Sequence, residues 1–253
     1  PIYQADPALL RQAEDTHVHT LWQGAVDHGA VLLHALFPRA YVDANRADND
    51  IDPDHIEGSY PEELRPSVKS QLGIGLCWTR VPPEGEPMYL RPLTAQQVLS
   101  RVNTYHRPYH RQLRRLLDQS HVKWGAVWHI NCHSMPAAGV PQQPGMGSGG
   151  RIDFVLGDRD GTTCEPEFTE FVASILRGFG YRVRVNDPYK GVELVRAHSD
   201  PVNGRHSLQI EINRRLYWDE RNMKKREGHF EEQREIMTKL IAVVCDYARS
   251  QAG

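Results

Sequence analysis

Residues 126–135 read AVWHINCHSM, and within them the stretch Ala126 to Cys132 has the pattern of a buried strand. It is a short apolar run with β-branched and aromatic side chains, followed closely by a segment rich in proline and glycine. Successive side chains of a strand point to opposite faces, so His129, Asn131 and His133 are expected on one face. A core histidine with a polar partner and a metal ligand are the two interpretations of this segment. His133 is the better ligand candidate because it lies where the strand gives way to a loop.

A second strand is predicted at Leu208 to Ile212, within the sequence LQIEIN. Gln209, Glu211 and Asn213 alternate with apolar residues there and are expected on one face. A carboxylate in the middle of such a strand is costly unless it is paired, binds a metal or takes part in proton transfer. We interpret Glu211 as a functional residue, with a structural role as the alternative.

The rest of the chain alternates between apolar clusters and helical patterns. Further strands are predicted at Val31 to Phe37, Tyr41 to Ala44, Ile152 to Leu156 and Tyr181 to Val185. Helices are predicted after a capping box at Thr94 with a kink at Pro108, from near Pro166 to Gly178 and Gly180, and over Glu231 to Arg249. This order predicts an α/β fold in which helices cover both faces of a mostly parallel or mixed central sheet.

Composition limits the classes of protein to which the chain can belong. It has 253 residues, a formal charge of -2 and no stretch that reads as a linker, so a single domain over residues 1–253 is expected. The balanced charge gives no basic field for nucleic acid, and the dispersed cysteines indicate neither a zinc ribbon nor a disulfide framework. No segment has the length and apolarity of a membrane span or the order of a signal peptide. A cytoplasmic protein with a small-molecule ligand is expected, and its oligomeric state stays open.

Two further segments carry polar groups with functional potential. Asp15 and His19 lie one turn apart on a predicted helix and are placed to share an ion, although a solvated helix start is the alternative. Asn45 and Arg46 follow a predicted strand, and the planar fork of arginine suits a substrate carboxylate as well as a surface salt bridge. The loop Pro136 to Gly150 follows the His133 strand, and either a mobile loop near the site or an inert surface loop is expected there.

Taken together, and in their order, several segments resemble the N-formylglutamate amidohydrolase family. They are FPRAYVDANR, GLCWTRVPPEGEPMY, YHRPYH, NCHSMP, DFVLGDRDGTTC, NDPYKG and HSLQIEINRRLY, and the likeness covers nearly the whole chain. More distantly, the segment from Asp43 to Arg46 and the strand that ends in His133 look like parts of aspartoacylase and the zinc carboxypeptidases. The resemblance therefore implies a zinc-carboxypeptidase-like α/β architecture.

The resemblance also implies an activity and a set of site residues. The implied activity is metal-dependent removal of an N-acyl group, formyl in the first instance, from an acidic amino acid such as N-formyl-L-glutamate. Zinc or another divalent metal would be held by His133 and Asp15, and Glu211 would act as general base towards the metal-bound water. The implied substrate-binding residues are Asn45, Arg46, Arg80, Ser134 and His206.

The sequence departs from the family pattern in ways that keep alternatives open. The family's Pro-His-Ser/Ala-Gly motif, with another zinc histidine and its N-terminal strand, should lie just ahead of Pro1, so it is either outside these residues or absent. Asn131 stands where the family usually has aspartate, which alters charge beside the implied metal ligand. The segment Val192 to Arg196 differs from the usual glycine-rich version. A hydrolase of other N-acyl amino acids or small peptides, and a non-catalytic protein that binds acidic ligands, are therefore the alternatives.

Overall fold

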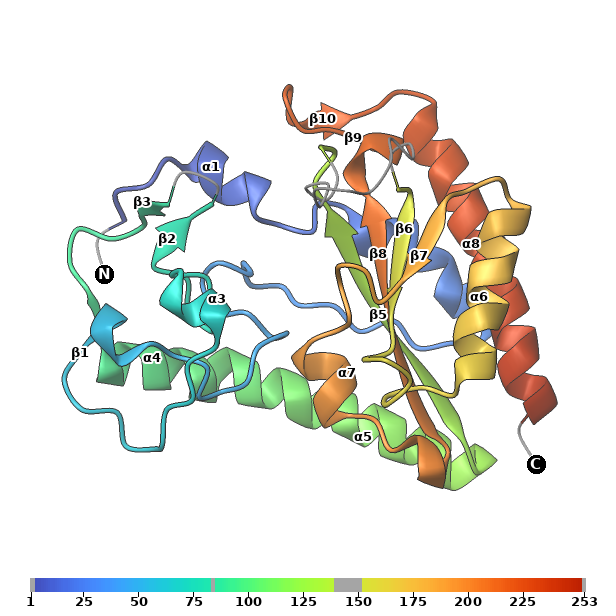
Figure 1. The fold of residues 1–253 in the computed structure, drawn as a ribbon, viewed down its shortest axis with the longest axis horizontal. Coiled ribbons are helices and arrows are strands. Elements are labelled where there is room, and N and C mark those ends of the chain that lie inside the picture. The colour runs from blue at the N-terminus through green and yellow to red at the C-terminus, as the bar shows by residue number, and fades with distance from the viewer. Residues whose placement is uncertain (1–2, 83–84, 139–151, 252–253) are drawn as a thin grey trace. The chain divides into compact units, whose positions relative to one another are not determined.

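The computed structural model describes residues 3–82, 85–138 and 152–251, and its chain divides into two compact units (Figure 1). Unit 1 contains Pro1–Thr16 and His34–Arg115, and unit 2 contains His17–Leu33 and Leu116–Gly253. The expectation of a single domain stays a prediction. Most of the predicted loop from Pro136 to Gly150 lies outside the described residues, so its mobility also stays a prediction.

Unit 2 is built around a mixed sheet with the strand order β5-β8-β6-β7 in the described part of the chain. Its strands are β5 (Val127–Met135), β6 (Phe154–Gly157), β7 (Val183–Val185) and β8 (Arg205–Asn213). β5 runs parallel to β8 and β6 parallel to β7, whereas β6 and β8 are antiparallel. The prediction of an α/β fold with a mixed sheet is confirmed, and each of these strands coincides with a predicted one.

One face of this sheet carries the core of unit 2. Phe154 and Leu156 on β6 and Ile210 on β8 are buried there, in a cluster to which helices α6 and α8 and the segment around α2 contribute. The bounds are α2 (Val18–Leu21), α6 (Pro166–Gly178), α7 (Glu193–Ala197) and α8 (His229–Gln251). On the opposite face, the backbone N–H of Val192 at the start of α7 donates to the side chain of Gln209. Helical segments thus contact both faces.

Shorter elements complete the described part of unit 2. They are the 3-10 helices η1 (Gln23–His28), η4 (Pro201–Asn203) and η5 (Arg214–Leu216) and the strand pair β9 (Trp218–Asp219) and β10 (Lys224–Lys225). None of the described helices combines the length and the apolarity needed to cross a bilayer.

Unit 1 has short elements around a second apolar cluster, in which Val42, Leu76 and Leu93 are fully buried. Its elements are α1 (Pro7–Gln12), η2 (Pro53–His55), β1 (Ile56–Glu57), α3 (Val68–Gln71), β2 (Arg80–Val81), β3 (Glu86–Pro87), β4 (Leu93–Thr94) and α4 (Ala95–Arg101). β1 pairs with β4, and β2 pairs with β3.

A long helical segment follows the predicted capping box. Thr94 accepts from the backbone N–H of Gln97, whose side chain in turn accepts from the N–H of Thr94, as α4 begins. α4 continues through the π-helical segment η3 (Val102–His106) into α5 (Arg107–Trp124). Pro108 lies in the first turn of α5, and the irregularity expected at this proline takes the form of the wide turn just before it.

Two predicted strands are wrong. The stretch Val31 to Phe37 is irregular, and none of its side chains is fully buried: Val31 is 66% and Leu36 is 91% exposed. A short apolar run alone does not establish burial. The stretch Tyr41 to Ala44 is buried at Val42 but forms no ladder. Its Asp43 N–H instead donates to the carbonyl of Leu76 at 2.7 Å.

The helix predicted across Asp15 and His19 is also wrong. α1 ends at Gln12, and α2 begins only at Val18, after His17 has adopted a left-handed backbone with φ 60°. Asp15 and His19 are therefore not one helical turn apart, and the spacing that suggested a shared ion does not apply. The sequence alone does not reveal this break because the intervening residues have ordinary helix propensity.

Candidate active site

The polar residues of β5 and β8 meet on the face of the sheet opposite the core. Because the two strands are parallel neighbours, His133 is the register partner of Glu211, and Asn131 is the partner of Gln209. His133 and Glu211 are 8% and 7% exposed. Both stand near the carboxyl ends of their strands, where binding sites of α/β sheets form. The faces predicted separately for the two strands are thus one continuous polar surface.

A chain of amide groups leads along this surface to the Glu211 carboxylate. Asn131 donates from Nδ2 to Oε1 of Gln209 at 3.2 Å, and Gln209 donates from Nε2 to Oε1 of Glu211 at 2.9 Å. The N–H of Val192 also donates to Oε1 of Gln209, at 3.3 Å. Since a backbone N–H can only donate, it fixes which end of the Gln209 amide is the oxygen. The nitrogen of that amide is thereby directed at Glu211.

The chain beyond His133 is held by a buried arginine. Arg214 donates from Nε to the Ser134 hydroxyl at 3.0 Å and from Nη1 to Glu220 at 2.9 Å. The other carboxylate oxygen of Glu220 accepts from the N–H of Ala137 at 2.8 Å. Ser134 and Ala137 are thus tied to the same ion pair, which fixes the chain where it leaves β5. The role of Ser134 in substrate binding stays a prediction.

His129 occupies the beginning of the same polar face. Its Nδ1 lies 2.7 Å from the Ser207 hydroxyl, which belongs to its register partner on β8. Burial disfavours the charged imidazole and lowers the pKa of His129 to about 4. His129 is therefore neutral at neutral pH.

The structure does not bring His206 to this face. It is on the opposite side of β8 from Glu211, stacks on Trp128 with ring centroids 5.2 Å apart and an interplanar angle of 17°, and lies 3.8 Å from the Glu165 carboxylate. Glu165 also accepts from Trp128 Nε1 and the Tyr247 hydroxyl, each at 3.2 Å. Burial lowers the pKa of His206 although Glu165 opposes this. These contacts give His206 a structural environment within the core of unit 2.

Unit 1 contains the other predicted group, centred on the buried Asp43. Arg39 lies between two carboxylates, 2.9 Å from Asp15 and 3.0 Å from Asp43, and Arg46 is 3.9 Å from Asp43. Burial opposes ionisation of Asp43, but Arg39 and Arg46 outweigh it, so the pKa of Asp43 is below its usual value. Asp15 therefore sits in a salt-bridged cluster of unit 1, whereas His133 belongs to unit 2.

Asn45 and Arg46 are both buried beside this cluster. The N–H of Asn45 donates to Oδ1 of Asp43 at 2.9 Å. Arg46 Nε is buried, has no hydrogen-bond partner among the described residues, and lies 3.9 Å from the Asp43 carboxylate. Arg80 is exposed on β2 and donates to the carbonyl of Gly85 at 3.0 Å. Its assignment to a second substrate carboxylate stays a prediction.

A zinc site needs a particular set of His, Cys, Asp or Glu ligands. Catalytic zinc sites use three protein ligands and leave one position open. The described residues contain no group of three or more His, Cys, Asp or Glu side chains arranged to hold one ion. His133 and Glu211 supply two adjacent candidates in unit 2. The described residues therefore do not fit a complete zinc site by themselves.

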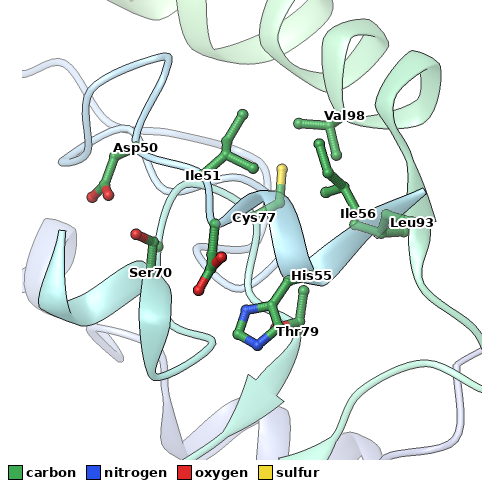
Figure 2. Close-up of a pocket in the computed structure, with 11 residues that line it drawn as sticks. Asp50, Ile51, His55, Ile56, Ser70, Cys77, Thr79, Leu93 and Val98 are labelled. Carbon is green, nitrogen blue, oxygen red and sulfur yellow. The ribbon is translucent and has the colours of Figure 1, made fainter. Parts of the chain in front are cut away.

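A small cavity in unit 1 is separate from these residues (Figure 2). Figure 2 shows Asp50 and Ser70 on one side of it and Ile56, Leu93 and Val98 on the other. Its volume of about 10 Å³ leaves room for about one water molecule. An acylated amino acid does not fit there, and the cavity is no candidate for the active site.

Several members of these clusters were not singled out from the sequence. The strand pattern puts Gln209 on the correct face but indicates no role for it, and no sequence motif singles out Arg39 or Arg214. Arg39 and Arg214 each have a partner far away in the sequence, Asp15 and Ser134, and the contact of Gln209 with Asn131 depends on strand register. A strand period gives the face of a side chain but not its neighbour on the next strand.

Comparison with known proteins adds independent information. A family model described as N-formylglutamate amidohydrolase matches residues 2–218. An N-formylglutamate deformylase of Pseudomonas putida is 28% identical over 211 residues, which cover 81% of this chain and 71% of the relative. The crystal structure of an N-formylglutamate amidohydrolase from Ralstonia eutropha JMP134 is similar with a TM-score of 0.91 and 42% identity, over 98% of this chain and 88% of that one. A gene product of Agrobacterium tumefaciens shares the fold at 17% identity with a TM-score of 0.60.

Proposed function

The chain belongs to the N-formylglutamate amidohydrolase family, and from this premise we propose that it hydrolyses N-formyl-L-glutamate to formate and L-glutamate. The observation that carries the proposal is the pairing of His133 with Glu211 at the carboxyl ends of β5 and β8. The names of the similar proteins support the choice of substrate.

Glu211 is the proposed general base. In this reaction a water oxygen adds to the formyl carbon, and the bond from that carbon to the amide nitrogen then breaks. Glu211 takes a proton from the water and returns it to the departing amine, a role worth roughly 10²- to 10⁴-fold in rate. The Gln209 amide, 2.9 Å from the carboxylate, orients Glu211 for this transfer. Formate and the free amine of L-glutamate are the products.

Arg46 is the proposed site for a substrate carboxylate, with Asn45 beside it. A guanidinium binds a carboxylate through two parallel charge-assisted hydrogen bonds. The buried guanidinium of Arg46 supports this assignment, and Asp43, 3.9 Å from its Nε, helps to hold the side chain in place. Binding there would restrict the orientations open to the substrate.

By resemblance to the family, a divalent metal such as zinc is proposed, with His133 as the ligand in unit 2. The ligand role expected of Asp15, which is paired with Arg39 in unit 1, stays a prediction. Such an ion would supply an electrophile and an acidified water when bound. Because the described residues do not complete a three-ligand set, we assign no step of the reaction to it. Metal content of the purified protein tests this part independently of turnover.

The test of the proposed function is formate release from N-formyl-L-glutamate, measured before chelation, after chelation and after return of zinc. Release that disappears with chelation and returns with zinc supports both the reaction and the metal. Release that persists in a metal-free protein rejects the metal and keeps the reaction. If a zinc-loaded protein releases no formate, the substrate is wrong, and other N-acyl amino acids and small peptides are the next panel.

A further inference from the structure

The loop that contains Asn45 and Arg46 is buried, yet it forms no regular secondary structure. Buried backbone carbonyls need hydrogen-bond donors, and this loop has no sheet ladder to supply them. On the N–H side, Asp43 holds the loop: the N–H of Asn45 donates to its side chain at 2.9 Å, and the N–H of Arg46 donates to its carbonyl at 3.1 Å. The carbonyl side is held by two histidines.

His106 and His110 supply those donors from the adjoining helix. His106 Nε2 lies 2.8 Å from the carbonyl oxygen of Arg46, and His110 Nε2 lies 2.8 Å from that of Ala44. A carbonyl oxygen only accepts, so each Nε2 carries the proton. The two hydrogen bonds hold the backbone carbonyls on either side of Asn45.

The geometry of the helix brings both imidazoles to the same loop. Residues four apart lie on one helix face, and the rings of His106 and His110 stack with centroids 4.2 Å apart and an interplanar angle of 25°. His106 is the last residue of the π-helical segment that immediately precedes α5. π-helical turns recur at functional sites, where they redirect a side chain.

A third residue of the same helix secures the chain just past the loop. Arg107 donates from Nε and Nη2 to Asp48, at 3.0 and 2.9 Å, and from Nη2 to Glu62 at 2.7 Å. Asp48 is two residues beyond Arg46, so the exit of the loop is fixed as well. The helix thus contacts this loop over residues 44–48.

We propose that His106 and His110 are positioning residues for the substrate-carboxylate site, because their paired bonds to the Ala44 and Arg46 carbonyls fix the direction of the Arg46 guanidinium. The proposal rests on the proposed function of Arg46. It assigns a role to the motif YHRPYH, residues 105–110, which has none in the proposed reaction. Neither histidine need touch the substrate.

The test compares His106→Leu, His106→Gln and the matched control His121→Leu. The Gln nitrogen stands as many bonds from Cα as His Nε2, so glutamine keeps a donor that leucine lacks. His121 also donates through Nε2 to a carbonyl, that of Asn203 at 2.7 Å, but it is only half-buried and belongs to unit 2. We expect His106→Leu to raise KM for N-formyl-L-glutamate roughly tenfold with kcat within about twofold. His106→Gln should restore most of the loss, and His121→Leu should match the wild type.

Hydrogen exchange measured by mass spectrometry on a peptide spanning residues 41–49 gives a readout independent of turnover. Faster exchange there in His106→Leu, but not in His121→Leu, is expected. Unchanged KM in His106→Leu overturns the proposal. An equal fall of kcat in His106→Leu and His106→Gln also overturns it, because the imidazole ring of His106 would then serve only the packing of the fold. If the wild type releases no formate, the proposed function fails. The exchange data then decide alone whether the two histidines hold the loop.

Discussion

His133 and Glu211 are register partners in the parallel pair β5–β8, each two residues before the end of its strand. The pair brings an imidazole and a carboxylate together on a buried polar face, although 78 residues separate them in sequence. Glu211 is oriented on this face by an amide donor, at 2.9 Å from Gln209. The first prediction tests the proton transfer proposed at Glu211.

Replacement of Glu211 by glutamine should abolish most turnover and leave binding largely intact. Glu211→Gln keeps the size of the side chain and an oxygen that can accept from Gln209, but it cannot take a proton. We expect kcat for formate release to fall by roughly 10²- to 10⁴-fold with a small change in KM. The exposed Glu235→Gln on α8 is the matched control. Normal turnover in Glu211→Gln would remove this residue from the base role.

Loss of the Arg46 guanidinium should affect binding more than chemistry. Arg46→Ala removes the proposed carboxylate site, and hydrogen bonds to charged groups contribute about 1.5–3 kcal/mol, so KM should rise roughly 10- to 100-fold. We expect kcat to change far less. The exposed Arg65, which pairs with Glu63, provides the control variant Arg65→Ala. A fall in kcat at constant KM would instead place Arg46 in the chemical step.

The amide at position 131 should prove necessary for the orientation of Gln209. In Asn131→Asp a carboxylate oxygen faces Gln209 Oε1, which the Val192 N–H already holds. The buried contact becomes repulsive, or the amide turns and Glu211 loses its donor. We expect a free energy of unfolding lower by about 1–3 kcal/mol, measured by urea denaturation, together with reduced kcat.

Asn103→Asp serves as the comparison for that variant. The Asn103 side chain is exposed and uses its oxygen to accept from Arg107, a role that a carboxylate fills equally well. Its unfolding free energy should stay at the wild-type value. Equal stability of Asn131→Asp and the wild type would contradict the inferred orientation of Gln209.

His129 should make the protein less stable at mildly acidic pH. Burial holds its pKa near about 4 in the folded state, below the usual 6.5, so the unfolded chain binds more protons between these values. The contribution of neutral His129 to the free energy of unfolding is therefore fully present above about pH 6.5, and it is lost as the pH drops towards about 4. Between about pH 7.5 and pH 5, protonation linked to His129 should lower the free energy of unfolding by at most about 2 kcal/mol.

The variant His129→Gln tests this assignment, because an amide can still bond the Ser207 hydroxyl but does not titrate. Urea denaturation at the two pH values should show a smaller loss of stability in His129→Gln than in the wild type. The control variant His229→Gln, at an exposed histidine, should lose as much unfolding free energy between the two pH values as the wild type. An identical loss in all three proteins would assign the acid sensitivity to other groups.

The sequence predicted the sheet of unit 2 well because strand periodicity and burial agree there. The alternation in LQIEIN identified the polar face of Glu211, and that face is present. In unit 1 the same reasoning failed at Tyr41 to Ala44, because burial there is achieved by isolated backbone bonds and side-chain donors rather than by a ladder. The family resemblance implied a substrate-binding role for His206. Its position differs from that of Glu211 by an odd number, which places it on the other face of β8, and its role stays a prediction.

The chain crosses between the two units three times, after Thr16, Leu33 and Arg115. The segment from His17 to Leu33 is enclosed in the sequence by unit 1, yet its Val18, Leu21 and Trp22 pack in the core of unit 2. No single cut separates two self-sufficient pieces, and a fragment beginning at Leu116 would lack part of its own interior. Each unit consists of two separate stretches of the sequence, so neither can be expressed whole as one contiguous fragment.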